Sequence, residues 1–452
     1  MNIIIVGCGK VGSALAEQLA GEGHDVTVID TNPDAIKRVM DVADVMGVEG
    51  NGLVHMVQEE AGIKYADMFI SMTASDEMNL LCCLIAKKAS SCRTIARVRN
   101  PDFISERGFI KEKLGISMII NPELESASEM ARLFSIPSAI EVDTFARGKV
   151  ELLKTRLPAN SPIIDKQIKD VLGKLSGKML VCAIERDGQV IIPTGDSFLQ
   201  AGDIISFVTT HKARSSFFKK AGIDNDHIKS IIIVGGGKIT YYLVRKLSEY
   251  GFKVKIIEKD RKRCEYLNSI LPGNVVIING DGSDQRLLLE EGIDGADGFA
   301  SITDIDEENI MLSLYVGSNF NVKTITKINK LNFEGIIDRL TIGSVVYPKN
   351  ITAEMIISYV RALENSSGSN VQTLYNIVGG RAQALEFNVR SQSAVVGVPL
   401  CELKLRENLL LCCISRGGKI IVPSGQDTIE IGDTVVVVTT SKGLNDLKDI
   451  LA

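Results

Sequence analysis

Short apolar runs along this chain are followed by longer segments with helical spacing. The first run covers residues 2–6 and is β-branched after Asn2, and a glycine-rich turn leads from it into residues 13–19. Consecutive apolar residues over this length predict a strand that is buried on both faces. The segment after the turn has the spacing of a helix. The chain therefore opens with a strand, a tight turn and a helix.

The turn carries glycines at the positions that a phosphate-binding turn requires. Gly7 permits the tight turn, Gly9 lets backbone amides approach a pyrophosphate, and Gly12 lets the helix pack against the strand. The next strand, residues 24–30, ends in Asp30, roughly 20 residues on, where a carboxylate would bind the ribose hydroxyls. Because a carboxylate repels a 2′-phosphate, the pattern favours NAD(H) or another adenine nucleotide over NADP(H).

The same pattern occurs twice, at an offset of about 230 residues. Residues 230–240 repeat the opening strand and turn, and the following strand, residues 252–258, ends in Glu258. Each half continues with alternating strands and helices, which predicts a β-α-β-α-β-α-β-α-β order and a doubly wound parallel sheet. A helix then leaves each sheet, at residues 123–134 and 352–363.

A smaller unit with strand periodicity closes each half. Residues 181–195 and 411–425 predict hairpins, the first of which turns at Asp187-Gly188. The predicted fold class is α/β, with two tandem Rossmann-like doubly wound parallel-sheet domains, each followed by a small α+β domain. We expect nucleotide-binding domains at 1–137 and 228–364, small domains at 138–222 and 371–452, and a flexible linker at 364–370.

Composition narrows the class of protein. A chain of 452 residues is too long for one ordinary core, and 45% hydrophobic with 24% charged residues is typical of soluble globular proteins. A net charge of −5 without a basic stripe argues against nucleic-acid binding. The apolar runs fall short of the roughly 20 residues that cross a bilayer, and the N-terminus does not resemble a signal peptide. We therefore expect a cytosolic protein.

Cysteines and histidines give little sign of a metal or catalytic centre. Nine cysteines lie in apolar runs without a C-x-x-C pair, and there are only four histidines, so we expect buried reduced thiols and no metal site. Cys8 stands at a helix start, where thiolate character would suit a redox sensor. His24 begins the second strand, which favours a surface role, and His55 lies in the same predicted domain.

The ordered combination of these features resembles the TrkA family, the peripheral cytosolic subunits of bacterial Trk potassium-uptake systems. The resemblance covers essentially the whole chain and rests on segments 7–12, 50–52, 73–79 and 96–99 and on the two hairpins. Such proteins contain two tandem units that regulate potassium conductance, each with a nucleotide-binding Rossmann-like domain and a TrkA-C domain. The expected architecture of this chain is the same.

The resemblance implies a regulator rather than an enzyme. Its ligand would be NAD(H), with ATP or ADP as further candidates, and it would pass its conformational state to a membrane-embedded, TrkH-like potassium transporter subunit. Family members also assemble into rings beneath the pore. The implied location is the cytoplasm, peripheral to the inner face of the cell membrane through the partner.

The resemblance and the strand ends together suggest the cofactor site. The glycine turn would cradle the phosphates, Asp30 would bind the ribose, Asn51 would lie near the adenine, and Arg97 would face the phosphates, a neighbouring subunit or a surface ion-pair partner. Lys10 could instead point to solvent and take no part in binding. The candidate residues are Gly7, Cys8, Gly9, Lys10, Val11, Gly12, Asp30, Asn51, Thr73, Ala74 and Arg97 in the first half, and Gly235, Gly236, Gly237, Lys238, Ile239, Glu258, Asp281 and Thr303 in the second.

The second half departs from the pattern at two of these places. Thr240 replaces the third glycine and brings a β-branched side chain to the point where helix and strand pack closely. Lys327 replaces Arg97 and loses the planar fork that binds phosphate bidentately. We therefore predict altered geometry at the second site and tighter nucleotide binding at the first.

No catalytic residue is predicted. A dehydrogenase needs a proton donor or acceptor beside the nicotinamide, and the small β-rich units leave no large substrate domain to close over a cofactor. Two alternatives remain open. One is an NAD-dependent oxidoreductase whose small domains bind a small-molecule substrate. The other is a soluble redox or nucleotide sensor that has no membrane partner and uses Cys8.

Overall fold

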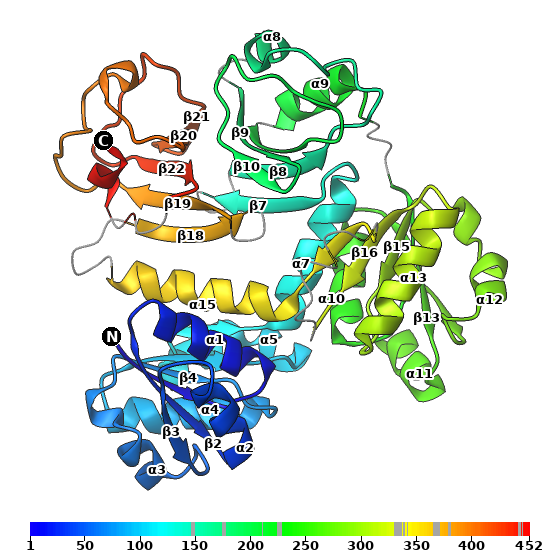
Figure 1. Ribbon diagram of the computed structural model, residues 1–452. Coiled ribbons are helices and arrows are strands. Elements are labelled where there is room, and N and C mark those ends of the chain that lie inside the picture. The colour runs from blue at the N-terminus through cyan, green and yellow to red at the C-terminus, as the bar shows by residue number, and fades with distance from the viewer. Residues whose placement is uncertain are drawn as a thin grey trace. The chain divides into compact units, whose positions relative to one another are not determined.

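The computed structural model in Figure 1 describes residues 1–145, 150–173, 178–209, 211–223, 228–329, 337, 340, 342–364, 371–377, 381–441, 444 and 446–452. These residues form two compact units, Met1–Ala131 with Lys229–Ile357, and Arg132–Ile228 with Ser358–Ala452. The first unit holds both Rossmann-like sheets, and the second holds both smaller sheets. The division falls inside the two helices that leave the sheets, α7 (Pro122–Ser135) and α15 (Pro348–Glu364).

The first sheet has the strand order β3-β2-β1-β4-β5-β6, and its neighbouring strands are parallel. This is the order of doubly wound dinucleotide-binding domains, so the predicted fold class is confirmed. Its strands are β1 (Asn2–Val6), β2 (Asp25–Asp30), β3 (Met46–Glu49), β4 (Met68–Ser71), β5 (Arg93–Arg97) and β6 (Met118–Ile120). The prediction of five strands missed β6, because three residues are too few to show a period.

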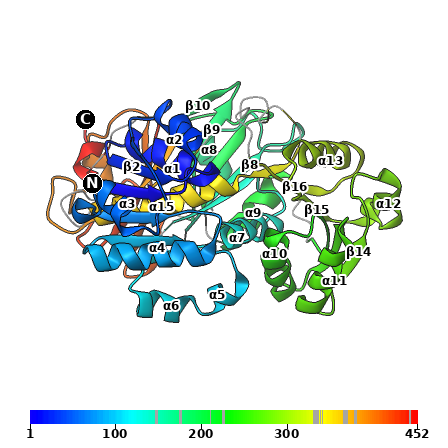
Figure 2. The same cartoon turned by 90° about the horizontal axis from the view of Figure 1, so that it is seen from below.

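Helices cover both faces of this sheet. Figure 2 shows α1 (Lys10–Gly21) and α2 (Pro33–Met40) on one side and α4 (Asp76–Ala89) on the other. On the α4 face, Phe69, Cys82 and Cys83 share one buried cluster. Burial on both faces explains why the strands read as unbroken apolar runs. The remaining helices are α3 (His55–Glu60), α5 (Pro101–Ser105) and α6 (Arg107–Leu114).

The second sheet repeats the first with the order β14-β13-β12-β15-β16-β17. Its strands are β12 (Ser230–Val234), β13 (Lys253–Glu258), β14 (Val276–Asn279), β15 (Gly298–Ser301), β16 (Lys323–Lys327) and β17 (Ser344–Val346), and its helices are α10 (Lys238–Glu249), α11 (Arg261–Ile270), α12 (Gln285–Glu290) and α13 (Asp306–Asn319). The helix after this sheet, α15, starts at Pro348, ahead of the predicted residue 352. Residues 365–370 of the predicted linker lie outside the described residues.

The second unit contains two five-stranded antiparallel sheets, with orders β10-β9-β11-β8-β7 and β18-β19-β22-β20-β21. The elements of the first are β7 (Glu141–Phe145), β8 (Val150–Arg156), α8 (Ile168–Leu172), β9 (Met179–Arg186), β10 (Gln189–Ile191), β11 (Ile204–Thr209) and α9 (His211–Ala221). Those of the second are β18 (Val371–Ile377), β19 (Ala382–Asn388), β20 (Leu409–Arg416), β21 (Lys419–Ile421) and β22 (Thr434–Thr439). One buried cluster joins both sheets and contains Cys182 and Cys412.

Both predicted hairpins form in this unit. Asp187 and Gly188 have φ of 50° and 78°, and Gly417 and Gly418 have φ of 54° and 82°. Positive φ at both central residues is the signature of the type I′ turn, whose twist matches that of the strands it joins. The dipeptides Asp-Gly and Gly-Gly suit this turn because they tolerate that backbone.

No helix among the described residues combines the length and apolar character needed to cross a membrane.

Candidate nucleotide-binding sites

Each Rossmann-like domain begins with a glycine turn that leads into a helix with an open N-terminus. Gly7 has φ of 100° and Gly235 has φ of 105°, and the turn residues Gly9 and Gly237 cap α1 and α10 with nearly the same dihedral angles. Neither helix has a side-chain cap or an acidic residue in its first turn. The first amides of such a helix lack intrahelical partners and carry the positive end of the helix dipole, so they suit an anion.

The glycines are required for different steric reasons. A Cβ atom at Gly7 would lie 3.1 Å from the backbone of Met72 and Thr73, so the turn passes close to the end of β4. A Cβ atom at Gly12 would lie 1.9 Å from the carbonyl oxygen of Gly7. At Gly9 a Cβ atom would meet nothing within 4 Å. Gly9 thus leaves open space at the helix start, where a pyrophosphate would lie.

Thr240 fits where the third glycine was expected. Its side chain is fully buried, and its hydroxyl donates a hydrogen bond to the carbonyl oxygen of Gly235. The prediction of altered geometry therefore does not hold for the turn dihedrals. Since a Cβ atom at the matching Gly12 would collide with a carbonyl, α10 cannot approach its turn as closely as α1 does.

The acids at the ends of the second strands bind the glycine turns. The carboxylate of Asp30 accepts hydrogen bonds from the amide of Cys8 at 2.6 Å and from the amide of Asn32 at 2.9 Å. Glu258 repeats this with the amides of Gly236, at 2.6 Å, and Asp260, at 2.8 Å. Each carboxylate is thus fixed beside its turn, at the place where a ribose would be bound.

The third strands end in compact turns. Asn51 accepts a hydrogen bond from the amide of Leu53 at 3.0 Å, and Asp281 accepts one from the amide of Ser283 at 2.9 Å. The amide and the hydroxyl of Ser283 both donate to Asp281, and these two bonds lower the pKa of Asp281 below its usual value. Neither side chain bonds to a glycine turn among the described residues.

An asparagine that was not among the candidate residues organises the ends of β4 and β5. The side-chain oxygen of Asn79 accepts hydrogen bonds from the amide of Thr73 at 2.8 Å and from its hydroxyl at 2.7 Å. Its side-chain nitrogen donates to the carbonyls of Thr73 and Arg97, at 3.2 Å and 2.9 Å. Asn309 makes the same bonds to Thr303 and Lys327. An asparagine six residues after the threonine, in both halves of the chain, was the sequence signal that could have identified this residue.

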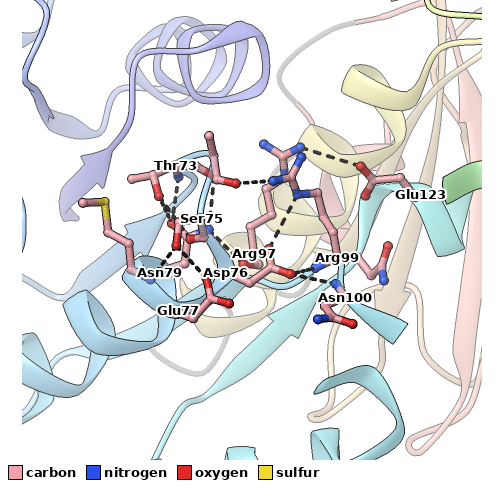
Figure 3. A network of polar contacts seen from close by, with 12 residues as sticks. Thr73, Ser75, Asp76, Glu77, Asn79, Arg97, Arg99, Asn100 and Glu123 are labelled. Atoms are coloured by element: carbon pink, nitrogen blue, oxygen red, sulfur yellow. Dashed lines mark hydrogen bonds and ion pairs between the residues drawn. The ribbon is translucent and has the colours of Figure 1, made fainter. Parts of the chain in front are cut away.

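A network of charged side chains borders the first site (Figure 3). Asp76 accepts hydrogen bonds from the amides of Arg99, at 2.8 Å, and Asn100, at 2.7 Å. The guanidinium of Arg99 donates to the carbonyl oxygen of Ala74 and lies 3.5 Å from Asp76. Arg99 therefore ties the end of β5 to the loop after β4.

Arg97 lies in the same network and is mostly buried. Its Nη2 is 3.9 Å from Oε1 of Glu123, and the two side chains are 18% and 17% exposed. Burial lowers the pKa of Arg97, and this effect exceeds the opposite effect of the negative charge on Glu123. This pair is too long for a good hydrogen bond, and Nε of Arg97 has no hydrogen-bond partner among the described residues, so the guanidinium has donors to offer a ligand.

The second site has a different set of charges. Lys327 lies 3.2 Å from the exposed Asp304, and Asn329 stands where the first half has Arg99. The amide of Asn329 still donates to Asp306, at 2.9 Å. The backbone of the network is therefore kept, whereas both arginines are lost.

One alternative and two expectations from the sequence do not hold. Burial, reinforced by the charge of Asp30, raises the pKa of the Cys8 thiol to about 12, so thiolate character at this turn is not supported. His24 is buried rather than on the surface, with Nδ1 3.4 Å from the N-terminal amine. It precedes β2, at the end of the strand opposite Asp30. Cys401 is also an exception to the expectation of buried thiols, because it is exposed.

Three further residues discussed from the sequence or matched to it lie at the surface. Lys10 is exposed, and Lys238 is exposed at the corresponding position. His55 is exposed at the start of α3 and lies 3.7 Å from Glu59. The turn, the acid after β2 and the loop after β4 thus lie together at the carboxyl edge of the first sheet, and their counterparts do so in the second.

Comparison with known proteins places this arrangement in a family. The TrkA-N domain model matches residues 3–122 and 231–348, and the TrkA-C domain model matches residues 153–222 and 384–452. The chain is 33% identical to "Trk system potassium uptake protein TrkA homolog" of Archaeoglobus fulgidus, over 100% of both chains. It is 30% identical to "Trk system potassium uptake protein TrkA" of Haemophilus influenzae, over 98% of this chain and 96% of that one.

Solved structures agree on the fold. The structure of the GsuK channel is 18% identical to this chain and gives a TM-score of 0.63, and the match covers 98% of this chain and 77% of that one. A structure described as the GsuK channel bound to NAD gives a TM-score of 0.62 at 17% identity, covering 98% of this chain and 77% of that one. The glycine turns, the paired sheets and the matches over the whole length lead to one conclusion: the chain belongs to the TrkA family of Trk-system potassium uptake proteins.

Proposed function

We propose that this protein is a nucleotide-binding regulatory subunit that controls a membrane potassium-uptake transporter. The observation that carries the proposal is the pair of open helix starts, α1 and α10, each with an acid fixed beside its glycine turn. Each can take a pyrophosphate on its amides and a ribose on its carboxylate. The relatives named for potassium uptake support the transport role.

The ligand is NAD(H), with ATP or ADP as a competing nucleotide. Asp30 and Glu258 accept hydrogen bonds and repel an added ribose phosphate, which favours NAD(H) over NADP(H). The NAD-bound neighbour supports this choice. In the first site the unused donors of Arg97 would suit a phosphate oxygen.

The protein acts by binding rather than by catalysis. Of the two histidines in the first domain, His24 lies at the end of β2 away from Asp30, and His55 pairs with Glu59 on α3. A nucleotide that binds one conformation better than another shifts the population toward it, by no more than the difference in its affinities. The conformation is then passed to the transporter.

The partner is a TrkH-like integral membrane subunit, and the protein works as a ring of several copies. It lies in the cytoplasm against the inner face of the membrane, held there by this partner. The names of the relatives and the channel neighbour support a membrane partner.

The test is an affinity pull-down of the tagged protein from gently solubilised native membranes, with and without NADH and ATP. We expect to recover a polytopic potassium-transport protein in a yield that depends on the nucleotide. A variant that carries both Gly9→Asp and Gly237→Asp should remove the nucleotide effect, because each carboxylate occupies a phosphate position in otherwise open space. Recovery of no membrane protein under any condition would contradict the proposal.

A further inference from the structure

One tyrosine joins the second nucleotide-binding domain to the first. Tyr242 lies on α10 and is 6% exposed. Its hydroxyl donates a hydrogen bond to the carbonyl oxygen of Arg99 at 3.0 Å and accepts one from Nδ2 of Asn121 at 3.0 Å. All three residues belong to the same compact unit, and Figures 1 and 2 both show α10 beside α7. The phenol is therefore fixed by two bonds outside its own domain.

At its first-domain end, this link reaches the border of the first site. The guanidinium of Arg99 donates to the carbonyl oxygen of Ala74. It also pairs with Asp76, as Figure 3 shows. Ala74 follows Thr73, whose amide backs onto the glycine turn at Gly7. A shift of the Arg99 backbone would therefore move the loop that faces the first nucleotide.

At the other end, α10 begins at the second glycine turn. Tyr242 lies about one turn into this helix, which starts at Lys238. The helix thus spans from the second phosphate position to the edge of the first site.

Among the residues that the structure describes, α1 offers no counterpart of this tyrosine. The position in α1 that corresponds to Tyr242 is occupied by Ala14, which carries no polar group. Neighbouring Tyr241 bonds within α10, accepting a hydrogen bond from Arg245 at 2.7 Å. In the described part of the chain, it is therefore α10 and not α1 whose side chain bonds to residues of the other Rossmann-like domain.

We propose that a nucleotide bound at the second glycine turn changes the affinity of the first site, and that the hydroxyl of Tyr242 carries this coupling. The inference rests on the proposed nucleotide binding at both turns. A phosphate that binds the open start of α10 repositions the helix, and the two hydrogen bonds transmit the movement to Arg99 and Asn121. Coupling of this kind is reciprocal, because both ligands bias the same element.

The experiment is a double-mutant cycle on the full-length protein, with NADH titrated by calorimetry. Gly237→Asp blocks the second turn in open space, as Gly9→Asp blocks the first. We expect Gly237→Asp to change the first-site dissociation constant by at least about fivefold, a typical coupling. In the Tyr242→Phe background, Gly237→Asp should leave the first-site dissociation constant unchanged. Tyr241→Phe is the matched control and should keep the full effect.

A second readout excludes a purely structural role for the tyrosine. In Gly9→Asp, where only the second site can bind, NADH should slow amide hydrogen exchange at Arg99 and Asn100. This slowing should vanish when Tyr242→Phe is added. Circular dichroism and gel filtration confirm that each variant is folded.

The outcomes separate the inference from the proposed function. Binding at both turns without coupling in the parent protein, or coupling that persists in Tyr242→Phe, overturns the inference and leaves the proposed function intact. Binding at the first turn alone also overturns it. If NADH, ATP and ADP all fail to bind either turn, the proposed function itself fails.

Discussion

At the scale of single residues, the glycines of one turn differ sharply in what they tolerate. Gly12 has a carbonyl 1.9 Å from the position of an added Cβ atom, and Gly7 needs positive φ. Gly9 has neither constraint. A substitution at Gly12 would disturb the packing of helix on strand as well as the ligand, whereas one at Gly9 tests the ligand alone.

The first prediction compares the two turns by the same substitution. Gly9→Asp and Gly237→Asp each place a carboxylate at a helix start, where it satisfies free amides and repels a pyrophosphate. Because the first site keeps both arginines of its network, we expect Gly9→Asp to remove the tighter phase of NADH binding in a calorimetric titration. Greater loss from Gly237→Asp would contradict this order.

The second prediction concerns a lysine at the start of β16. Burial lowers the pKa of Lys323 to about 7 from an ordinary value of 10.5, and its amine donates to the hydroxyl of Ser344 at 2.9 Å. Between these values the unfolded chain binds more protons than the folded one, so this group makes stability rise with pH. Below the lower value the folded protein must hold a buried charge.

Replacement of this lysine should therefore stabilise the protein most at low pH. We expect Lys323→Met to raise the midpoint of thermal unfolding more at about pH 6 than at about pH 9. The matched control is Lys253→Met, at the exposed start of β13. An equal rise of the midpoint at both pH values would contradict the prediction, because it would show that charging this amine costs the folded protein no stability.

Residue types in the sequence predicted the turn well and its surroundings poorly. The glycine spacing located Gly7, Gly9 and Asp30, because each answers a local backbone or ligand requirement. The burial of His24 and the raised pKa of Cys8 depend on neighbours from other segments, which a linear pattern does not contain. The same holds for the two bonds of Tyr242.

At the scale of elements, one buried asparagine joins two strand ends. Asn79 begins the second turn of α4, accepts from Thr73 and Ser71, and donates toward the end of β5. A polar side chain with no exposed surface is stable there because nearly all of its hydrogen-bonding capacity is used. Sequence periodicity had marked α4 as a helix but could not assign its buried polar face.

The third prediction removes this connection. Asn79→Ala leaves several polar groups without partners in a buried place, so we expect it to lower the free energy of unfolding by about 3 kcal/mol. Urea unfolding followed by circular dichroism measures the change. Asn319→Ala, at the exposed end of α13, is the control and should have little effect. A similar loss from both variants would contradict the structural role of Asn79.

Secondary structure was predictable where elements were long and repeated. The strands β1 and β12 and the hairpins follow from apolar runs and turn residues that occur in both halves. The three-residue strands β6 and β17 have no pattern of their own, and they exist because an already formed sheet offers them an edge.

At the scale of the whole molecule, the chain is a duplication whose halves have diverged at the ligand edge. The fold is preserved strand by strand, while Arg97, Arg99 and Gly12 have become Lys327, Asn329 and Thr240. Divergence at this edge would give the two sites different ligands or different affinities. Internal repetition made the architecture predictable from the sequence. The relation between the two nucleotide-binding sites could not be predicted in this way.

The fourth prediction concerns transport in cells. In cells that lack their own copy of this subunit, we expect Gly9→Asp to support less potassium uptake than the parent protein at equal protein levels. Gly108→Asp adds the same charge at an exposed glycine of α6 with open space around it, and should restore uptake fully. Equal uptake by both variants would contradict this prediction, because it would show that transport does not depend on the glycine turn.

The uncapped start of α1 has a consequence for the free protein. The side chain of Asn32 accepts a hydrogen bond from the amide of Asp34 at the start of α2, whereas no described side chain caps α1. The nucleotide is therefore the missing N-cap of α1, and of α10. Without it, the first turn of each helix should fray and exchange its amide hydrogens quickly, while that of α2 stays protected. Inorganic phosphate should slow this exchange in part, so nucleotide affinities measured in phosphate buffer should be weaker than those measured without it.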